Sequence, residues 1–274
     1  MEKIIKPKPF KQLRCSDNYM FAKVMEDEET CRKVLEVLLD IKIDRLTYPE
    51  PEKSLFTGPD AKGVRLDVHT SDDNRDFDIE IQTTVYSELR ERSRYYQDIM
   101  DLDYLQKGHR YSELKDNIVI FICLDDLFKK GLPIYTFENI CRENNSIKLQ
   151  DRTMKVFYNC SKWKDIESKE KSELLKFLLT DKPRTDLCKR LKEREAKIKM
   201  TAREYKEYMD YCDLVDSSRQ EGYEQGKEDG REENALAIAR NMLIENVPEE
   251  TVVRCTGLSP EKVSELAESV KCKT

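Results

Sequence analysis

The sequence is poor in the residues that bind soft metal ions. Only two of its 274 residues are histidines, His69 and His109, and its nine cysteines include no Cys-x-x-Cys pair. An odd number of scattered cysteines argues against a disulfide framework and against a thiolate zinc site, and it favours a reducing cytoplasm. Any metal ion must therefore be held mainly by oxygen, which favours a hard cation such as Mg²⁺.

Long hydrophobic runs are also absent. The longest covers residues 118–124, far short of a membrane span, and the start MEKIIKPKPF has no apolar stretch typical of a secretory signal. Charged residues make up 38% of the chain, and the mean hydropathy is −0.75. We therefore predict a cytoplasmic protein with no membrane partner, long enough for one good-sized core and a smaller accessory region.

The negative charge is concentrated in one part of the chain. Residues 216–250 contain ten acidic and four basic residues, a net charge of −6 that equals that of the whole chain. The rest is nearly neutral and begins with a basic arm formed by Lys3, Lys6, Lys8, Lys11 and Arg14. A DNA partner is compatible with this distribution, but charge supports it only through that arm.

Residues 64–82 have the pattern of two short strands around a polar turn. Because side chains alternate between the two faces of a strand, Asp67 and Glu80 each point away from the apolar side chains of their strand. Residues 71–74, Ser-Asp-Asp-Asn, are typical of a turn. If the two strands pair, Asp67 and Glu80 share one face within reach of a single cation. This pair is our candidate active site.

The next stretch predicts a crossover between two strands. Residues 76–82 form the first strand, and residues 117–124 are apolar on both faces, as in a central strand. Residues 88–106 between them have helical spacing and end just before Gly108. Strand, helix and strand in this order should make the two strands parallel.

Weaker signals surround this unit. Ser16 or Asp17 can cap a first helix, and residues 45–48 are a strand candidate that Pro49 and Pro51 would end. Further candidates are a second helix through Leu38, strands at 134–137 and 154–158, and a closing helix near 169–179.

The composition changes after Pro183. Apolar residues from Leu187 to Cys212 form a narrow seam on a long charged helix, typical of a helical hairpin or a coiled-coil arm. Gly222, Gly226 and Gly230 then recur every fourth residue. Since glycine weakens a helix by about 1 kcal/mol relative to alanine, the repeat indicates either close helix packing or a linker.

The last part of the chain predicts three short helices at 235–245, 248–255 and 260–270. Gly257 and the capping residue Ser259 separate the last two, which gives the outline of a helix-turn-helix. The last helix is rich in glutamate, however, and this suits phosphates poorly. We therefore favour a small interaction or dimerisation module, with self-association through these helices as one expectation.

Six segments, in order and suitably spaced, resemble one nuclease superfamily. They are DNYMFAKVMED (17–27), DAKGVRLDV (60–68), DIEIQ (78–82), RSRYYQDIMD (92–101), NIVIFICL (117–124) and IYTFEN (134–139). They are similar to the PD-(D/E)XK superfamily and, within it, to the recombination-promoting nuclease (Rpn) and transposase-like family. The resemblance covers about residues 16–160. It implies an α/β fold with a restriction-endonuclease-like core at 1–182, followed by an all-helical region with an arm and glycine linker at 183–233 and a tail at 234–274.

The resemblance also implies an activity, a metal-dependent DNA endonuclease using Mg²⁺ or Mn²⁺. In that case the carboxylates of Asp67 and Glu80 and the backbone carbonyl of Ile81 would hold the ion. Asp17 matches the family's N-terminal acidic position and would orient the ion or its waters. A bound divalent cation polarises the phosphate and lowers the pKa of a bound water, which is what phosphodiester hydrolysis needs.

Gln82 departs from the superfamily pattern, which has lysine at that position. Glutamine can hold a water but brings no positive charge and cannot act as a base. Lys62 and Arg65 are candidate replacements, and we prefer Lys62 because the pKa of lysine shifts more readily. Arg65, Arg92 and Arg94 are candidate contacts to DNA phosphates, and Arg92 and Arg94 are also candidates for ordering the site.

We favour the nuclease among three hypotheses. The first alternative is a catalytically degenerate relative that binds DNA without cutting it, which the missing lysine makes reasonable. The second is a protein-interaction module whose working part is the helices of residues 184–270.

Overall fold

The computed structural model describes residues 7–47, 50–55, 64–84, 86–105 and 107–271. It divides into two compact units, Met1–Tyr208 and Met209–Thr274, which are considered separately. Within the ranges described, the model contains no helix with the length and apolar character needed to cross a bilayer.

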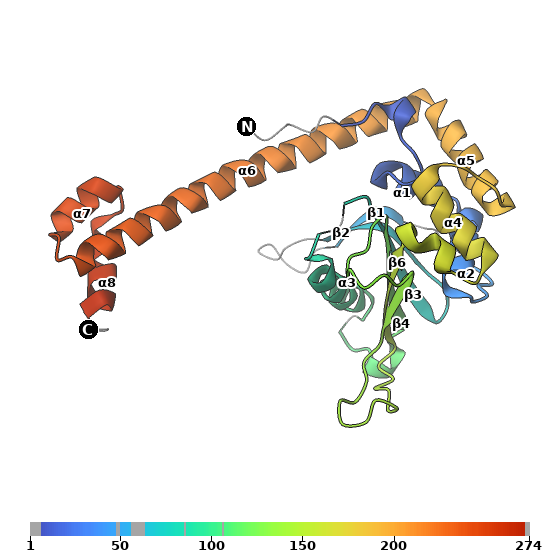
Figure 1. Cartoon of the computed structure of the whole chain (residues 1–274), viewed down its shortest axis with the longest axis horizontal. Coiled ribbons are helices and arrows are strands. Elements are labelled where there is room, and N and C mark those ends of the chain that lie inside the picture. The colour runs from blue at the N-terminus through green and yellow to red at the C-terminus, as the bar shows by residue number, and fades with distance from the viewer. Residues whose placement is uncertain (1–6, 48–49, 56–63, 85, 106, 272–274) are drawn as a thin grey trace. The chain divides into compact units, whose positions relative to one another are not determined.

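The first unit is built on a six-stranded mixed sheet with the order β1-β2-β3-β4-β6-β5 (Figure 1). β3, β4 and β6 run parallel at its centre, and the strands outside them are antiparallel to their neighbours. The strands are β1 (Glu50–Leu55), β2 (Val64–Ser71), β3 (Arg75–Gln82), β4 (Asp116–Cys123), β5 (Ile134–Phe137) and β6 (Thr153–Asn159).

The predicted crossover is confirmed. α3 (Leu89–Tyr104) connects β3 to β4, and these two strands pair in parallel register. The predicted turn before β3 is confirmed as well, because the Asp72 carboxylate accepts hydrogen bonds from the backbone N–H groups of Asn74 at 2.9 Å and Arg75 at 2.7 Å. An aspartate that bonds to the backbone two residues ahead is a common way to start such a turn.

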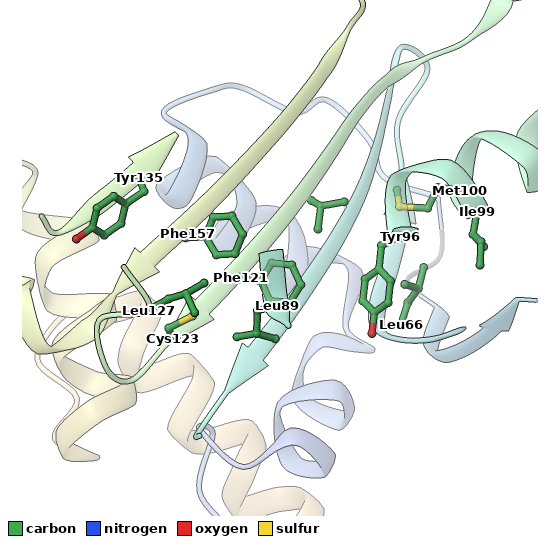
Figure 2. Close-up of a cluster of buried hydrophobic side chains, with 11 residues drawn as sticks. Leu66, Leu89, Tyr96, Ile99, Met100, Phe121, Cys123, Leu127, Tyr135 and Phe157 are labelled. Carbon is green, nitrogen blue, oxygen red and sulfur yellow. The ribbon is translucent and has the colours of Figure 1, made fainter. Parts of the chain in front are cut away.

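Helices cover both faces of the sheet (Figure 1). α3 packs on one face over a buried cluster that includes Leu89, Tyr96, Phe121 and Phe157 (Figure 2). On the other face, the Tyr158 hydroxyl donates a hydrogen bond to the Leu38 carbonyl. The helices on that side are α1 (Asn18–Met25), α2 (Glu28–Leu39) and α4 (Lys169–Thr180). Because both faces are covered, almost all of β3 and β4 is buried, the polar residues of β3 included.

The strand prediction for residues 45–48 is wrong. Residues 45–47 have no strand structure, and position 48 lies outside the described residues. The strand lies instead at β1, which contains Pro51 opposite Val68 of β2. Proline cannot donate a ladder hydrogen bond, but β1 is an edge strand, where one side of the backbone needs no partner.

The apolar seam predicted after Pro183 is divided between two helices, α5 (Asp186–Lys199) and α6 (Ala202–Ile244), with a break near Met200. α5 contacts α1, α2 and α4. Its buried Glu195 accepts a hydrogen bond from the Cys15 N–H at 3.1 Å. The first unit therefore runs through α5 to Tyr208, whereas the division predicted from the sequence lies at residue 182. Short 3₁₀ helices complete this unit: η1 (Phe10–Gln12), η2 (Tyr111–Glu113) and η3 (Cys160–Asp165).

The second unit contains the end of α6 with α7 (Glu249–Thr256) and α8 (Pro260–Lys271). The three helices share a small core of Ala239, Val252, Leu258 and Val263. Gly257 ends α7 with φ +74°, a conformation that favours glycine. α6 continues through Gly222, Gly226 and Gly230, and among the described residues an added Cβ at these positions would meet nothing within 4 Å. The glycines therefore pack against no other described part of this chain, and the linker stays a prediction.

Candidate active site

Asp67 and Glu80 meet where the pairing of β2 and β3 changes from backbone to side-chain hydrogen bonds. The two strands pair in antiparallel register as far as Val68 and Ile79. One step further, Glu80 Oε1 accepts a hydrogen bond from the Asp67 N–H at 2.9 Å. Asp67 Oδ2 in turn accepts one from the Ile81 N–H at 3.2 Å. The structure thus brings together the two carboxylates that strand alternation placed on one face.

The Glu80 side chain is almost completely buried, with 1% of its surface exposed. Its second oxygen, Oε2, accepts hydrogen bonds from Gln82 Nε2 and from Arg92 Nη2, both at 3.2 Å. Arg92 lies near the start of α3, and its Nε also donates to the Tyr96 hydroxyl at 3.1 Å. A guanidinium and an amide therefore hold the carboxylate in one orientation above the sheet.

Negative charge is crowded at this place. Burial raises the pKa of Glu80, and the nearby Asp67 carboxylate raises it further. Burial also raises the pKa of Asp78, and the nearby Glu80 carboxylate raises it further. Among the described residues neither oxygen of Asp78 has a hydrogen-bond partner, although its side chain is fully buried on the same strand. Two carboxylates that are buried and close together repel each other when both are ionised, so they tend to take up a proton or to bind a cation.

This donor set fits a hard divalent cation. In the part of the chain that the structure describes, there is no group of three or more His, Cys, Asp or Glu side chains that could hold a metal ion. Mg²⁺ does not require such a group, because it is usually bound by one or two carboxylates together with water and substrate phosphate. Asp67 and Glu80 are the pair that meets this requirement.

Comparison with known families identifies the chain. Residues 18–227, which include both carboxylates and the whole sheet, match the model of the PD-(D/E)XK nuclease family transposases. The chain belongs to this family. Residues 232–268 match the C-terminal HTH domain of the Rpn/YhgA-like nuclease family. A search of curated proteins found no match, and neither did a search of solved structures.

The second match corrects one prediction from the sequence. The glutamates of α8 led us to favour an interaction module over a helix-turn-helix. Residues 232–268, which include α8, instead match an HTH domain. The sequence signal that carried the correct alternative was Gly257 followed by the cap Ser259. Ser259 Oγ accepts a hydrogen bond from the Lys262 N–H at 3.3 Å.

The other predicted site residues of this nuclease-family chain are dispersed. Asp17 precedes α1, and its carboxylate contacts Lys8 Nζ at 2.5 Å and the Arg14 N–H at 2.8 Å. Arg94 is exposed on α3. Lys62 and the side chain of Arg65 lie outside the described residues. Gln82, like Arg92, donates a hydrogen bond directly to Glu80.

The structure defines the surroundings of two further residues at the site. Arg92 was a candidate for contacting phosphate or for ordering the site, and it pairs with the buried Glu80. The predicted crossover contained the signal, because the helix that follows a strand packs back on the sheet and brings its first turns near that strand. Asp78 lies on the same strand as Glu80, and its complete burial had no sequence signal.

Replacing Arg92 with alanine is expected to lower the free energy of unfolding by about 1–3 kcal/mol, because it leaves a buried carboxylate without its cationic partner. Arg94→Ala is the matched control on the same helix, and its exposed side chain predicts a change below about 0.5 kcal/mol. Urea unfolding in EDTA measures both. Equal effects of the two substitutions would show that the ion pair with Glu80 contributes nothing to stability.

Proposed function

We propose that this member of the PD-(D/E)XK nuclease family is a divalent-metal-dependent DNA endonuclease that hydrolyses phosphodiester bonds. The observation that carries the proposal is the pairing of Asp67 with the buried Glu80 at the junction of β2 and β3. Two carboxylates in this position, with the Glu80 pKa raised by burial and by Asp67, attract Mg²⁺ or Mn²⁺.

Each residue of the site has a role in this proposal. Asp67, Glu80 and the carbonyl of Ile81 hold the ion. When bound, a divalent cation polarises the scissile phosphate and lowers the pKa of an attacking water. Gln82 orients Glu80 through its amide and can hold a water. Asp17 remains a candidate for ordering waters at the site.

Arg92 replaces the charge that the superfamily lysine would supply. Its guanidinium is 3.2 Å from Glu80 Oε2, so a permanent positive charge is present beside the carboxylate pair. Arginine stays protonated at all physiological pH values and cannot take a proton from water. Arg92 therefore acts as an electrostatic and positioning group, and the proton of the attacking water has to pass to solvent or phosphate.

The C-terminal unit fits a role in binding duplex DNA. An HTH domain places its second helix in the major groove and contacts the backbone with the other. In this chain α7 and α8 are the two helices joined by the Gly257 turn. Arg65 and Arg94 remain candidate phosphate contacts of the first unit. Self-association through the C-terminal helices stays a prediction.

Metal dependence tests the proposal directly. Supercoiled plasmid incubated with purified full-length protein should be nicked or linearised in Mg²⁺ or Mn²⁺, and EDTA should stop the reaction. Gel electrophoresis at a series of times measures the rate. Cleavage that persists in EDTA, or the absence of cleavage with both ions, would overturn the proposal.

A second function, DNA binding without cleavage, is favoured by one observation. Both oxygens of Glu80 already accept hydrogen bonds, from Asp67, Gln82 and Arg92. A metal ion must share these oxygens with those donors. If the donors exclude it, the protein binds DNA with an affinity that falls as salt rises, and it leaves plasmid intact in Mg²⁺ and Mn²⁺.

A further inference from the structure

A cavity of about 230 Å³ opens on the face of the sheet that carries Glu80. Its walls come from α3, β5, β6 and the loop after β4, all within the first unit. We call it the Phe pocket, and it is lined by Arg90, Ser93, Phe128, Phe137, Lys155 and Phe157.

Three phenylalanines form the apolar walls of the Phe pocket. The ring centroids of Phe128 lie 5.1 Å from Phe137 and 5.2 Å from Phe157, and those of Phe137 and Phe157 lie 5.9 Å apart. Phe137 is 44% exposed, although large aromatic side chains are usually covered. The pocket therefore presents aromatic surface to solvent.

The loop that carries Phe128 is firmly held. The Asp126 carboxylate accepts hydrogen bonds from the backbone N–H groups of Phe128 and Lys129, both at 3.0 Å, and of Gly131 at 2.7 Å. The Tyr135 hydroxyl donates to the same carboxylate at 2.9 Å. The pocket wall is thus formed in advance, and little conformational entropy is lost when a ligand enters.

Two cationic side chains border this apolar cavity. The Arg90 guanidinium lies 5.1 Å from the centroid of the Phe128 ring. Lys155 is half-buried, and burial lowers its pKa. A cation beside an aromatic wall is suited to a ligand that has both a flat ring and a negative charge.

The pocket lies in line with the candidate active site. Glu80 pairs in register with Phe121 of β4, and Phe121 pairs with Phe157 of β6. Because neighbouring strands are about 4.8 Å apart, the backbone of Phe157 is roughly 10 Å from that of Glu80. Figure 2 shows Phe121 between Phe157 and Tyr96, and the ring centroids of Phe121 and Phe157 are 5.1 Å apart.

We propose that the Phe pocket binds one unpaired base of the DNA strand whose phosphate is cut at Glu80, with Arg90 and Lys155 contacting the flanking phosphates. This inference rests on the proposed nuclease function. One water takes about 30 Å³, so the cavity holds roughly eight non-hydrogen atoms, the size of one pyrimidine. Bases stack on aromatic side chains whatever their identity. The Phe pocket accordingly favours single-stranded or locally unpaired DNA, whereas the C-terminal unit is the part proposed to bind duplex.

Binding measured by fluorescence anisotropy tests this inference. The full-length protein in EDTA is titrated into a labelled single-stranded oligonucleotide, the same strand with abasic sites, and the matching duplex. Removing the bases should weaken binding roughly 5- to 150-fold. The Phe137→Ala variant should bind the intact strand more weakly than the parent by a similar factor, and its affinity for the abasic strand should change little. The Phe137→Tyr variant should bind both strands with the affinity of the parent.

Tyr111→Ala is the matched control, because it removes an aromatic side chain that is 85% exposed on the same unit and does not line the pocket. Thermal melting confirms that each variant is folded. Equal affinity for intact and abasic strands, or an unchanged affinity of the Phe137→Ala variant for the intact strand, would overturn base binding in the Phe pocket. Metal-dependent plasmid cleavage would in that case still support the proposed nuclease function. Failure to bind or cut any DNA would overturn both.

Discussion

Replacing Glu80 with glutamine is expected to slow metal-dependent DNA cleavage by roughly 10²- to 10⁴-fold. Glutamine has nearly the same shape, and its carbonyl can still accept the hydrogen bond from the Asp67 N–H. It loses the charge that, with Asp67, attracts the divalent cation, and its NH₂ group cannot accept the hydrogen bonds that Gln82 and Arg92 donate to Oε2. The rate at which supercoiled plasmid is nicked in Mg²⁺ measures the effect.

Glu88→Gln is the control for this substitution, because Glu88 is an exposed glutamate just before α3 and its replacement should leave the rate unchanged. Asp67→Asn gives a second, independent removal of one charge from the pair. Should either Glu80→Gln or Asp67→Asn cut plasmid as fast as the parent in a clean preparation, the carboxylate pair does not hold the catalytic metal.

Asp78 is expected to make the stability of the metal-free protein strongly pH-dependent. Burial first, and then Glu80, raise the pKa of Asp78 in the folded state. An unfolded aspartate loses its proton near pH 4. Between these two pKa values the folded state binds more protons than the unfolded state, so the free energy of unfolding falls as pH rises. The slope is about 1.4 kcal/mol per pH unit for one such group.

Asp78→Asn removes this titration while preserving the shape of the side chain. The variant should therefore gain stability relative to the parent as pH rises above about 4 toward the raised folded-state pKa of Asp78. Guanidinium unfolding in EDTA at several pH values measures the difference. Asp73→Asn is the control, because Asp73 is exposed in the turn before β3 and should give no such trend. A constant difference between parent and Asp78→Asn would show that Asp78 is not held protonated.

Local residue patterns determined the arrangement of the core around the candidate site. The alternation of side chains along residues 64–82 and the polar turn at 71–74 determined which side chains of β2 and β3 lie on the same face of the sheet. The helical spacing of residues 88–106 before an apolar strand then required a parallel crossover. These predictions succeeded because they depend on backbone geometry, which repeats every two residues in a strand and every 3.6 in a helix.

The features that local patterns did not supply depend on partners distant in sequence, and the strand predicted at residues 45–48 was wrong for this reason. Pro51 is acceptable in β1 only because β1 became an edge strand, which its own sequence does not specify. α5 belongs to the first unit because it contacts α1, α2 and α4, although its apolar seam is narrow enough for a free arm. In each case, packing against residues far along the chain outweighed the local pattern.

The sequence by itself determined the α/β class, the crossover and the meeting of Asp67 with Glu80, because these follow from local periodicity. Only the tertiary structure decided that Arg92 turns inward to Glu80, that Asp78 is buried with no hydrogen-bond partner among the described residues, and that Phe128 reaches Phe137 and Phe157. The physical reason is burial. Whether a charge is paired, or an aromatic ring stays exposed, depends on what the rest of the chain covers, and a single stretch of residues does not contain that information.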